Sequence, residues 1–309
     1  MIRATTMSLD VFPLCLGGNV FGWTADEAAS FELLDAYVAA GGNFIDTADS
    51  YSMWVEGNSG GESETIIGRW MQARGNRDEL VIATKVGQLD GNLSASTIRD
   101  AAKASLERLQ TDRIDVYYAH IDDADTPLTE TLGAFDALVR AGVVGHLGAC
   151  GYGAERLAEA LAVSDAEGLA RYEAVQVHHN LLERRELDEA LSGLCLREGV
   201  AVFPYFGLAR GFLTGKYRPG RDVTSPRGGF GWTDGFDARS LAVLDALDEI
   251  AAAHSTTVAA VSLAWLRAQP GIAAPLASAR TVDQLEELLP SATLELDEAE
   301  VGRLTALGA

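Results

Sequence analysis

The stretch that decides the fold is Asn43-Phe-Ile-Asp-Thr-Ala-Asp-Ser-Tyr51, a short apolar run followed at once by polar residues. Two later stretches share this design: Val81-Ile-Ala-Thr-Lys85 ends in a lysine, and Ile114-Asp-Val-Tyr-Tyr-Ala-His120 ends in a histidine. Such β-branched or aromatic runs, set between helical stretches, are typical of buried parallel strands. Barrel enzymes build their active sites at the carboxyl ends of these strands. The sequence therefore predicts a barrel whose active site contains Asp46, Tyr51, Lys85 and His120.

The same alternation of strand and helix continues on both sides of these stretches, in roughly eight units, the number that closes a barrel. The other expected strands cover residues 12–22 (running into a glycine turn), 144–149, 175–177, 200–205 and 272–276. The expected helices cover residues 26–40, 62–73, 94–109, 128–141, 154–167, 186–197, 238–253 and 257–267, one from 281, and 297–307. We expect one α/β domain over residues 1–309, a (β/α)8 TIM barrel with extra helices near the C-terminus. The rival, a doubly wound sheet, is disfavoured because no G-x-G-x-x-G fingerprint follows the first strand.

Composition narrows the class of protein. The chain has 309 residues, 48% of them hydrophobic and 22% charged, which suits a soluble enzyme with one large core. Its net charge of −21 repels nucleic acid and anionic membranes, so a phosphate-bearing cofactor needs local cations. Three scattered cysteines predict no disulfide framework and no metal site. Without a signal-peptide core at the start or an apolar run of membrane-spanning length, we expect a cytoplasmic protein.

The four strand-end residues together have a specific chemical use. A tyrosine phenol has a pKa of about 10, and a lysine ammonium beside it favours the phenolate. A carboxylate keeps that lysine charged, and a histidine orients a substrate oxygen. Each residue alone is more often structural, as a turn cap, a rim residue or a surface charge. Together they predict a general acid aimed at a carbonyl oxygen, with hydride supplied by a nicotinamide cofactor.

At these residues the chain resembles the aldo-keto reductase superfamily, almost from end to end. Further matching stretches are Gly60-Gly-Glu-Ser-Glu-Thr-Ile-Ile-Gly68, Gln176-Val-His-His-Asn180, Ala209-Arg-Gly-Phe-Leu-Thr-Gly-Lys-Tyr217 and Ser278-Ala-Arg-Thr281. The bacterial branch related to potassium-channel β subunits looks most similar. The resemblance implies NADPH-dependent reduction of a small aldehyde or ketone to an alcohol. It makes Tyr51 the proton donor, tuned by Asp46 and Lys85, with His120 orienting the carbonyl; an oligomer is possible.

The resemblance also implies a cofactor lying across the barrel mouth. The residues expected to bind it, besides Asp46, are Gly18, Asn19, Val20, Cys150, Gly151, Gln176, Tyr205, Phe206, Gly207, Leu208, Arg210, Gly211, Lys216, Ser278, Ala279, Arg280, Gln284 and Glu287. Among these, Tyr205 would stack on the nicotinamide, and Arg280 at a helix start suits a 2′-phosphate, which favours NADPH over NADH. Structural alternatives stay open: a plain glycine turn at residues 18–20, a strand-end turn at Gln176, core packing of Tyr205, solvated basic side chains, and an ion pair of Arg280.

The chain departs from the family pattern at three places. Cys150-Gly151 stands where Ser-Asn is usual, and cysteine is a weaker hydrogen-bonding group for the carboxamide. Phe206-Gly207 replaces Ser-Pro, and Leu288 replaces an asparagine. These changes predict altered cofactor affinity rather than altered chemistry. Cys150 is also open to the plainer role of a small buried residue.

Aromatic residues near the predicted mouth, which are equally open to loop packing, suggest an apolar or ring-shaped substrate: Phe21, Trp23, Trp54, Phe206 and Trp232. Residues 218–236 are expected to form either a flap over the cofactor or an ordinary surface loop. Two other functions remain open. One is an NADPH-binding, redox-sensing interaction protein with slow turnover. The other is a specialised biosynthetic or sugar-modifying oxidoreductase.

Overall fold

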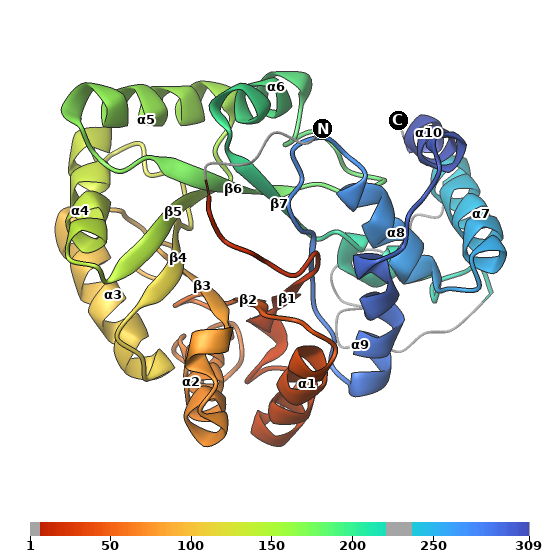
Figure 1. Cartoon of the computed structure of the whole chain (residues 1–309), viewed down its shortest axis with the longest axis horizontal. Coiled ribbons are helices and arrows are strands. Elements are labelled where there is room, and N and C mark those ends of the chain that lie inside the picture. The colour runs from red at the N-terminus through yellow and green to blue at the C-terminus, as the bar shows by residue number, and fades with distance from the viewer. Residues whose placement is uncertain (1–6, 221–236, 309) are drawn as a thin grey trace.

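A computed structural model describes residues 7–220 and 237–308 of the chain. These residues form one eight-stranded sheet in the order β7-β6-β5-β4-β3-β2-β1-β8, with parallel pairing throughout. Helices alternate with the strands and surround them (Figure 1), which confirms the predicted (β/α)8 barrel with additional C-terminal helices. The strands are β1 Cys15–Gly17, β2 Phe44–Asp46, β3 Val81–Val86, β4 Ile114–Ala119, β5 Val144–Cys150, β6 Tyr172–His178, β7 Ala201–Tyr205 and β8 Leu276–Ala277.

The sheet closes on itself between β7 and the segment before β8. The backbone N–H of Val202 donates to the Gly271 carbonyl at 3.1 Å, and the N–H of Ala273 donates to the Val202 carbonyl at 2.9 Å. The strand predicted over residues 272–276 is therefore wrong in extent, because only Leu276 and Ala277 pair with β1. Pro275 accepts from the Cys15 N–H at 2.9 Å through its carbonyl but has no N–H to donate, so regular pairing with β1 begins only at Leu276.

The helices begin where the sequence supplies capping groups. Ser94, Thr257 and Asp297 were expected inside helices, but each is the N-cap, accepting from a backbone N–H three residues later. The helix expected from residue 186 begins three residues later, capped by Asp188, and leaves Glu186 in the preceding loop. The helices are α1 Glu27–Ala39, α2 Glu62–Arg74, α3 Ala95–Leu109, α4 Leu128–Arg140, α5 Ala154–Glu167, α6 Glu189–Glu198, α7 Ala238–Ala253, α8 Val258–Arg267, α9 Val282–Leu288 and α10 Glu298–Leu307.

Apolar side chains fill the barrel interior. Phe44 of β2 and Phe203 of β7 meet edge to face with ring centroids 5.3 Å apart, and Tyr118 of β4 is buried in the same cluster. The N-terminal segment from Met7 packs against this cluster and crosses one end of the barrel (Figure 1). Because side chains alternate along a strand, the residue two positions after Phe44 also points inward, and that residue is Asp46. The packed interior thus forms the floor on which the polar strand-end residues lie.

Among the described residues, none of the helices combines the length and the hydropathy needed to cross a lipid bilayer.

Candidate active site

The ends of β2 and β3 bring three of the four predicted residues into direct contact. Lys85 Nζ donates to Asp46 Oδ2 at 2.6 Å, to the Tyr51 hydroxyl at 2.8 Å and to the Thr47 carbonyl at 2.7 Å. The Tyr51 hydroxyl in turn donates to Asp46 Oδ2 at 3.0 Å. The Lys85 and Asp46 side chains are each 1% exposed, so water does not screen their ion pair. The geometry is that of a phenol held between a buried ammonium and a buried carboxylate.

His120 lies at the edge of this group. Its ring and that of Tyr51 meet at 70°, with centroids 6.0 Å apart, and both residues line the same cleft. Its backbone N–H donates to the Val86 carbonyl at 2.8 Å, which fixes the start of the loop after β4. Burial, and next the Lys85 ammonium, hold the pKa of the His120 imidazole well below its ordinary value. The imidazole is therefore neutral at neutral pH.

The charge state of Tyr51 differs from the expected one. Burial, and next the charge and hydrogen bond of Asp46, raise the pKa of the Tyr51 phenol well above its ordinary value. The net direction is therefore opposite to the predicted lowering, because burial and the direct contact with Asp46, which the sequence did not reveal, outweigh the Lys85 ammonium. The phenol therefore carries its proton at neutral pH.

Gln176 of β6 also joins the group. Its Nε2 donates to Asp46 Oδ1 at 2.6 Å, so both oxygens of Asp46 are bound by described side chains. Gln176 is 1% exposed and in register with Cys150 of β5. Its inward side chain thus contacts the catalytic candidates directly, which a strand-end turn residue would not do.

A cleft of about 800 Å³ opens above these residues at the carboxyl ends of the strands. Its wall runs from the Asp46–Lys85 pair to the start of α9. Most predicted cofactor residues line it: Asn19, Asp46, Cys150, Gln176, Tyr205, Phe206, Gly207, Leu208, Arg210, Gly211, Lys216, Ser278, Arg280, Gln284 and Glu287.

Other predicted residues lie outside the lining of this cleft. Val20, Phe21 and Ala279 are buried in the main hydrophobic cluster, Val20 and Phe21 because a 3-10 turn at Gly18–Val20 directs the chain into the core. The carbonyl of Gly18 accepts from the Ser63 hydroxyl at 2.8 Å beneath the cleft.

Of the predicted substrate residues, Trp54 lines the cleft and is 46% exposed. Trp23 does not line the cleft, but its ring packs edge to face against that of Trp54, with centroids 5.6 Å apart. Trp232, with most of the predicted flap over residues 218–236, lies outside the described residues.

The loop after β7 has a strained backbone where it borders the cleft. Phe206, Ala209 and Arg210 have φ values of +53°, +46° and +55°, a left-handed conformation that costs a non-glycine residue about 1 kcal/mol or more. The Arg210 guanidinium lies 4.9 Å from the centre of the Phe206 ring. Strain of this kind is common where a loop clamps a ligand, which supports the predicted role of the loop.

The departure at residues 150 and 151 has a local explanation. Burial raises the pKa of the Cys150 thiol to about 12, so it stays protonated and is a poor nucleophile. Gly151 has φ +72°, a left-handed conformation that glycine adopts freely and asparagine tolerates better than most residues. The backbone there accommodates both this chain's glycine and the asparagine usual in the family.

The sequence interpretation missed several residues of the cleft. Gln88 and Ile121 line it just beyond the ends of β3 and β4. A search that extended a few residues past each predicted strand end would have found them. Gly17 was also missed. A Cβ atom at Gly17 would lie 2.6 Å from Ser278 Oγ, which itself donates to Asn19 Oδ1 at 2.6 Å. The absence of a side chain at Gly17 thus leaves room for the hydrogen bond between Asn19 and Ser278, which joins the segments that follow β1 and β8.

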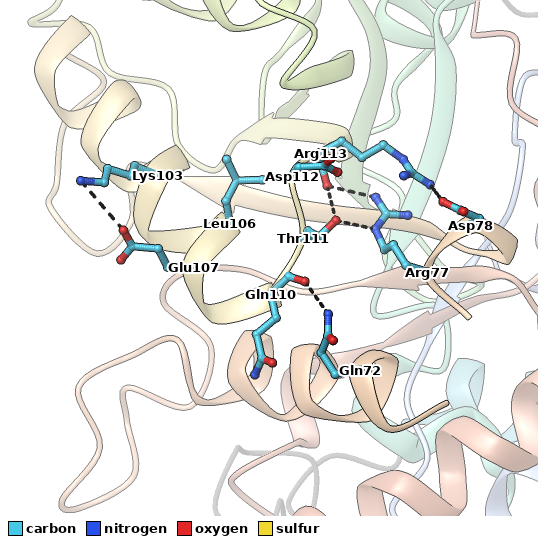
Figure 2. Close-up of a pocket in the computed structure, with 10 residues that line it drawn as sticks. All are labelled: Gln72, Arg77, Asp78, Lys103, Leu106, Glu107, Gln110, Thr111, Asp112 and Arg113. Atoms are coloured by element: carbon cyan, nitrogen blue, oxygen red, sulfur yellow. Dashed lines mark hydrogen bonds and ion pairs between the residues drawn. The ribbon is translucent and has the colours of Figure 1, made fainter. Parts of the chain in front are cut away.

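A second concavity of about 710 Å³ lies at the opposite, amino end of the strands, beside the C-terminal ends of α2 and α3 (Figure 2). Its charged side chains pair with one another: Arg113 with Asp78 at 2.8 Å, and Lys103 with Glu107 at 3.9 Å. Exposed pairs of this kind are worth little energy. Arg77 pairs at 2.7 Å with Asp115, which does not line the concavity, and Asp112 is the one charged lining residue with no ion pair among the described residues. The chemistry is therefore concentrated at the carboxyl end.

A parallel barrel with an Asp-Tyr-Lys-His group in a strand-end cleft defines a class, the nicotinamide-dependent oxidoreductases acting on C=O and CH–OH groups. Residues 13–309 match the model of the aldo/keto reductase family. The aldo-keto reductase ausK of Emericella nidulans is 32% identical, over 99% of this chain and 81% of its own. The norsolorinic acid reductase of Aspergillus flavus is 31% identical (97% and 78%), and protein tas of Escherichia coli is 32% identical (99% and 96%). The chain belongs to the aldo/keto reductase family; its place near the channel-related branch stays a prediction.

A buried carboxyl next to the site makes stability depend on pH. Asp49 is 1% exposed and has no ion-pair partner among the described residues; burial, and next Glu64, raise its pKa to about 7. Between pH about 4 and about 7 the folded state binds a proton that the unfolded state has lost, so stability falls as pH rises through this range. Asparagine cannot ionise, so Asp49→Asn escapes this loss. The free energy of unfolding of the variant minus that of the wild type is expected to be larger at pH about 8 than at pH about 5, by on the order of 2 to 4 kcal/mol.

Urea unfolding of both proteins at the two pH values measures this difference. Asp245→Asn is the matched control, because it removes the same charge from an exposed position on α7, away from Asp49. The assignment fails if the wild type and Asp49→Asn lose stability in parallel as the pH rises.

Proposed function

We propose that this protein reduces an aldehyde or ketone to an alcohol by hydride transfer from NADPH, with Tyr51 as the general acid. The observation that carries the proposal is the position of Lys85 Nζ, within 2.8 Å of both the Tyr51 hydroxyl and Asp46, on the floor of the cleft. A buried ammonium touching a phenol has an evident use in proton transfer and costs stability otherwise. The nicotinamide, when bound, supplies the hydride, which no side chain provides.

Tyr51 delivers the proton in this proposal. Its raised pKa keeps it protonated, so the acid is loaded before the carbonyl arrives. An alkoxide is a far stronger base than a phenolate, so transfer from the phenol to the developing alkoxide is downhill. The negative charge left on the phenol oxygen is stabilised by Lys85 Nζ at 2.8 Å, and Asp46 holds the lysine in place at 2.6 Å.

His120 orients the carbonyl. As a neutral imidazole in the same cleft, it offers one N–H to a substrate oxygen without adding a second cation beside Lys85. Trp54, partly exposed at the mouth, provides an apolar surface for the substrate's carbon frame.

The cleft also suits the dinucleotide. Gln176, Cys150 and Tyr205 would hold the nicotinamide end, where the raised pKa of Cys150 leaves a neutral thiol as a weak donor. Arg210 and Lys216 would hold the pyrophosphate, and cations in this cleft are notable in a chain of net charge −21. Ser278, Arg280, Gln284 and Glu287 would hold the adenosine end, with the Arg280 guanidinium available for a 2′-phosphate.

Replacing Arg280 with methionine tests the preference for NADPH. We expect KM for NADPH to rise about 10- to 100-fold, because a charge-assisted hydrogen bond is worth about 1.5–3 kcal/mol. The KM for NADH should change little, since NADH has no 2′-phosphate. Initial-rate kinetics with both cofactors measures the effect, and Arg185→Met, at an exposed position outside the cleft, is the control. Equal changes for the two cofactors would remove Arg280 from this role.

The proposed function is tested by NADPH oxidation over a panel of aldehydes, ketones and keto-sugars, repeated with NADH. Saturable turnover that disappears in Tyr51→Phe supports it. Negligible turnover on the whole panel, together with tight NADPH binding and co-purification with a stable partner, would instead support the redox-sensing alternative. A cytoplasmic location, the absence of nucleic-acid and membrane partners, and the oligomeric state stay predictions from the sequence.

A further inference from the structure

We infer that Phe206 is a positioning residue, whose ring holds the Arg210 guanidinium in the orientation that binds the pyrophosphate of the cofactor. The inference rests on the proposed function, which makes NADPH the ligand, and it goes further in one respect. Phe206 was expected to contact the cofactor by its place in the sequence alone, whereas here it acts through a second residue. A cation–π contact takes the place of the serine hydroxyl that is usual at this position in the family.

The backbone of Phe206 is held in a conformation that large side chains rarely adopt. Its φ is +53°, and its carbonyl accepts from the Ala209 N–H at 2.8 Å and from Asn180 Nδ2 at 3.0 Å. Asn180 is fully buried, so the second of these bonds comes from a fixed donor. Glycine would adopt the same geometry without strain. A phenylalanine here therefore indicates that its ring has a use that offsets the strain.

The Phe206 ring does not fill the core. It is 36% exposed and lines the cleft. The rings of Tyr205 and His178 meet it at 69° and 75°, with centroids 5.2 Å apart in each case, so two neighbours fix its orientation. The Arg210 guanidinium carbon lies 4.9 Å from its centre. The ring is thus a fixed support for a cation that borders the cleft.

Such a support suits a guanidinium that binds a phosphate. Two parallel hydrogen bonds to a phosphate form only when the planar guanidinium is correctly oriented. An arginine side chain loses much rotamer freedom in reaching that orientation. Stacking on an aromatic ring uses the face of the guanidinium and not its N–H groups, so the ring can fix the orientation before the ligand arrives.

Lys216 provides a second cation in the same loop. A Cβ atom at Gly211, the residue after Arg210, would lie 3.2 Å from Lys216 Nζ, so the ammonium packs against the loop backbone. Lys216 Nζ also lies 5.0 Å from the centre of the Tyr217 ring. Two cations supported by aromatic rings thus line the cleft of a chain with net charge −21. The pyrophosphate is the anionic group of NADPH that matches them, because the loop begins directly after Tyr205, at the proposed nicotinamide end.

Three substitutions separate the aromatic face from the bulk of the side chain. Phe206→Leu keeps an apolar side chain but has no aromatic face, whereas Phe206→Tyr keeps the face. Phe31→Leu is the matched control, because it removes another phenylalanine ring that supports an arginine, Arg74 at 5.7 Å, outside the cleft. Thermal unfolding checks that every variant is folded.

Isothermal titration calorimetry measures binding of NADPH and of two fragments: 2′-phospho-ADP-ribose, which keeps the pyrophosphate, and adenosine 2′-monophosphate, which lacks it. We expect Phe206→Leu to raise the Kd of NADPH and of phospho-ADP-ribose about 3- to 30-fold, the range of a cation–π contact. The Kd of adenosine 2′-monophosphate should not change. Phe206→Tyr and Phe31→Leu should bind all three compounds as the wild type does. In steady-state kinetics, Phe206→Leu should raise KM for NADPH without lowering kcat.

A double-mutant cycle tests whether Phe206 acts through Arg210. Arg210→Met alone should weaken binding of phospho-ADP-ribose about 10- to 100-fold. Adding Phe206→Leu should weaken it little further, because no guanidinium is left to position. Losses that multiply would overturn the inference, as would wild-type binding by Phe206→Leu or an equal loss of affinity for adenosine 2′-monophosphate. Failure of the proposed function is distinguishable, because the wild type would then reduce no carbonyl compound, whereas these binding measurements need no turnover.

Discussion

Replacing Tyr51 with phenylalanine is expected to lower kcat for carbonyl reduction by about 10²- to 10⁴-fold, the usual contribution of a positioned general acid. The substitution removes one oxygen atom and keeps the ring, which packs edge to face against Trp54 and His120. NADPH affinity should therefore stay within a few-fold of wild type. Single-turnover kinetics gives the loss in rate, and fluorescence titration gives the dissociation constant of the cofactor.

The control for this substitution is Tyr152→Phe. Tyr152 is buried outside the cleft, where its ring meets that of Tyr172 edge to face with centroids 5.6 Å apart, so kcat should not change. If Tyr51→Phe retains wild-type kcat, the phenol is not the proton donor, and the proposed mechanism is wrong at its central step.

Replacing Lys85 with methionine is expected to destabilise the fold by about 3–5 kcal/mol and to abolish measurable reduction. Methionine has a similar volume, but it leaves the Asp46 carboxylate 1% exposed without its cation. Removing one partner of a buried ion pair costs about that much, because the remaining charge is desolvated without compensation. Urea unfolding and steady-state kinetics measure the two effects.

Adding Asp46→Asn to Lys85→Met separates stability from catalysis. Without the buried charge, the double variant should regain most of the lost stability, and it should remain inactive because no ammonium stabilises the phenolate of Tyr51. If activity recovers together with stability, Lys85 acts only as a structural partner of Asp46.

The fold and the site could be predicted as far as they follow from apolar strands that end in polar residues at one rim of the barrel. Asp46, Lys85 and His120 were found because each follows an apolar run, and parallel strands bring those ends together at one rim. The eighth strand was placed poorly, because its pairing depends on where Pro275 interrupts it. No local pattern shows which residues a short strand will meet across a closed barrel.

The remaining errors came from contacts between segments far apart in sequence. The bond from Gln176 to Asp46 joins residues 130 positions apart, and the raised pKa of Tyr51 depends on burial that only the assembled barrel produces. Phe21 was expected at the mouth because it falls in or near a loop there, but the 3-10 helix Gly18–Val20 directs the ring into the core. Sequence pattern predicts which face a residue shares with its neighbours and not how deeply that face is covered.

The two-residue strand β8 has a consequence for biosynthesis. The Lys85–Asp46 pair spans 39 positions, whereas the contact between Asn19 and Ser278 spans 259. A nascent chain can thus assemble its ion pair early, while the edges of β1 and β7 stay open until residues 271–277 have left the ribosome. Open strand edges recruit strands of other molecules, so newly made copies are most prone to aggregate in that interval. Chaperone demand for this protein should therefore depend on how fast the chain between β7 and β8 emerges.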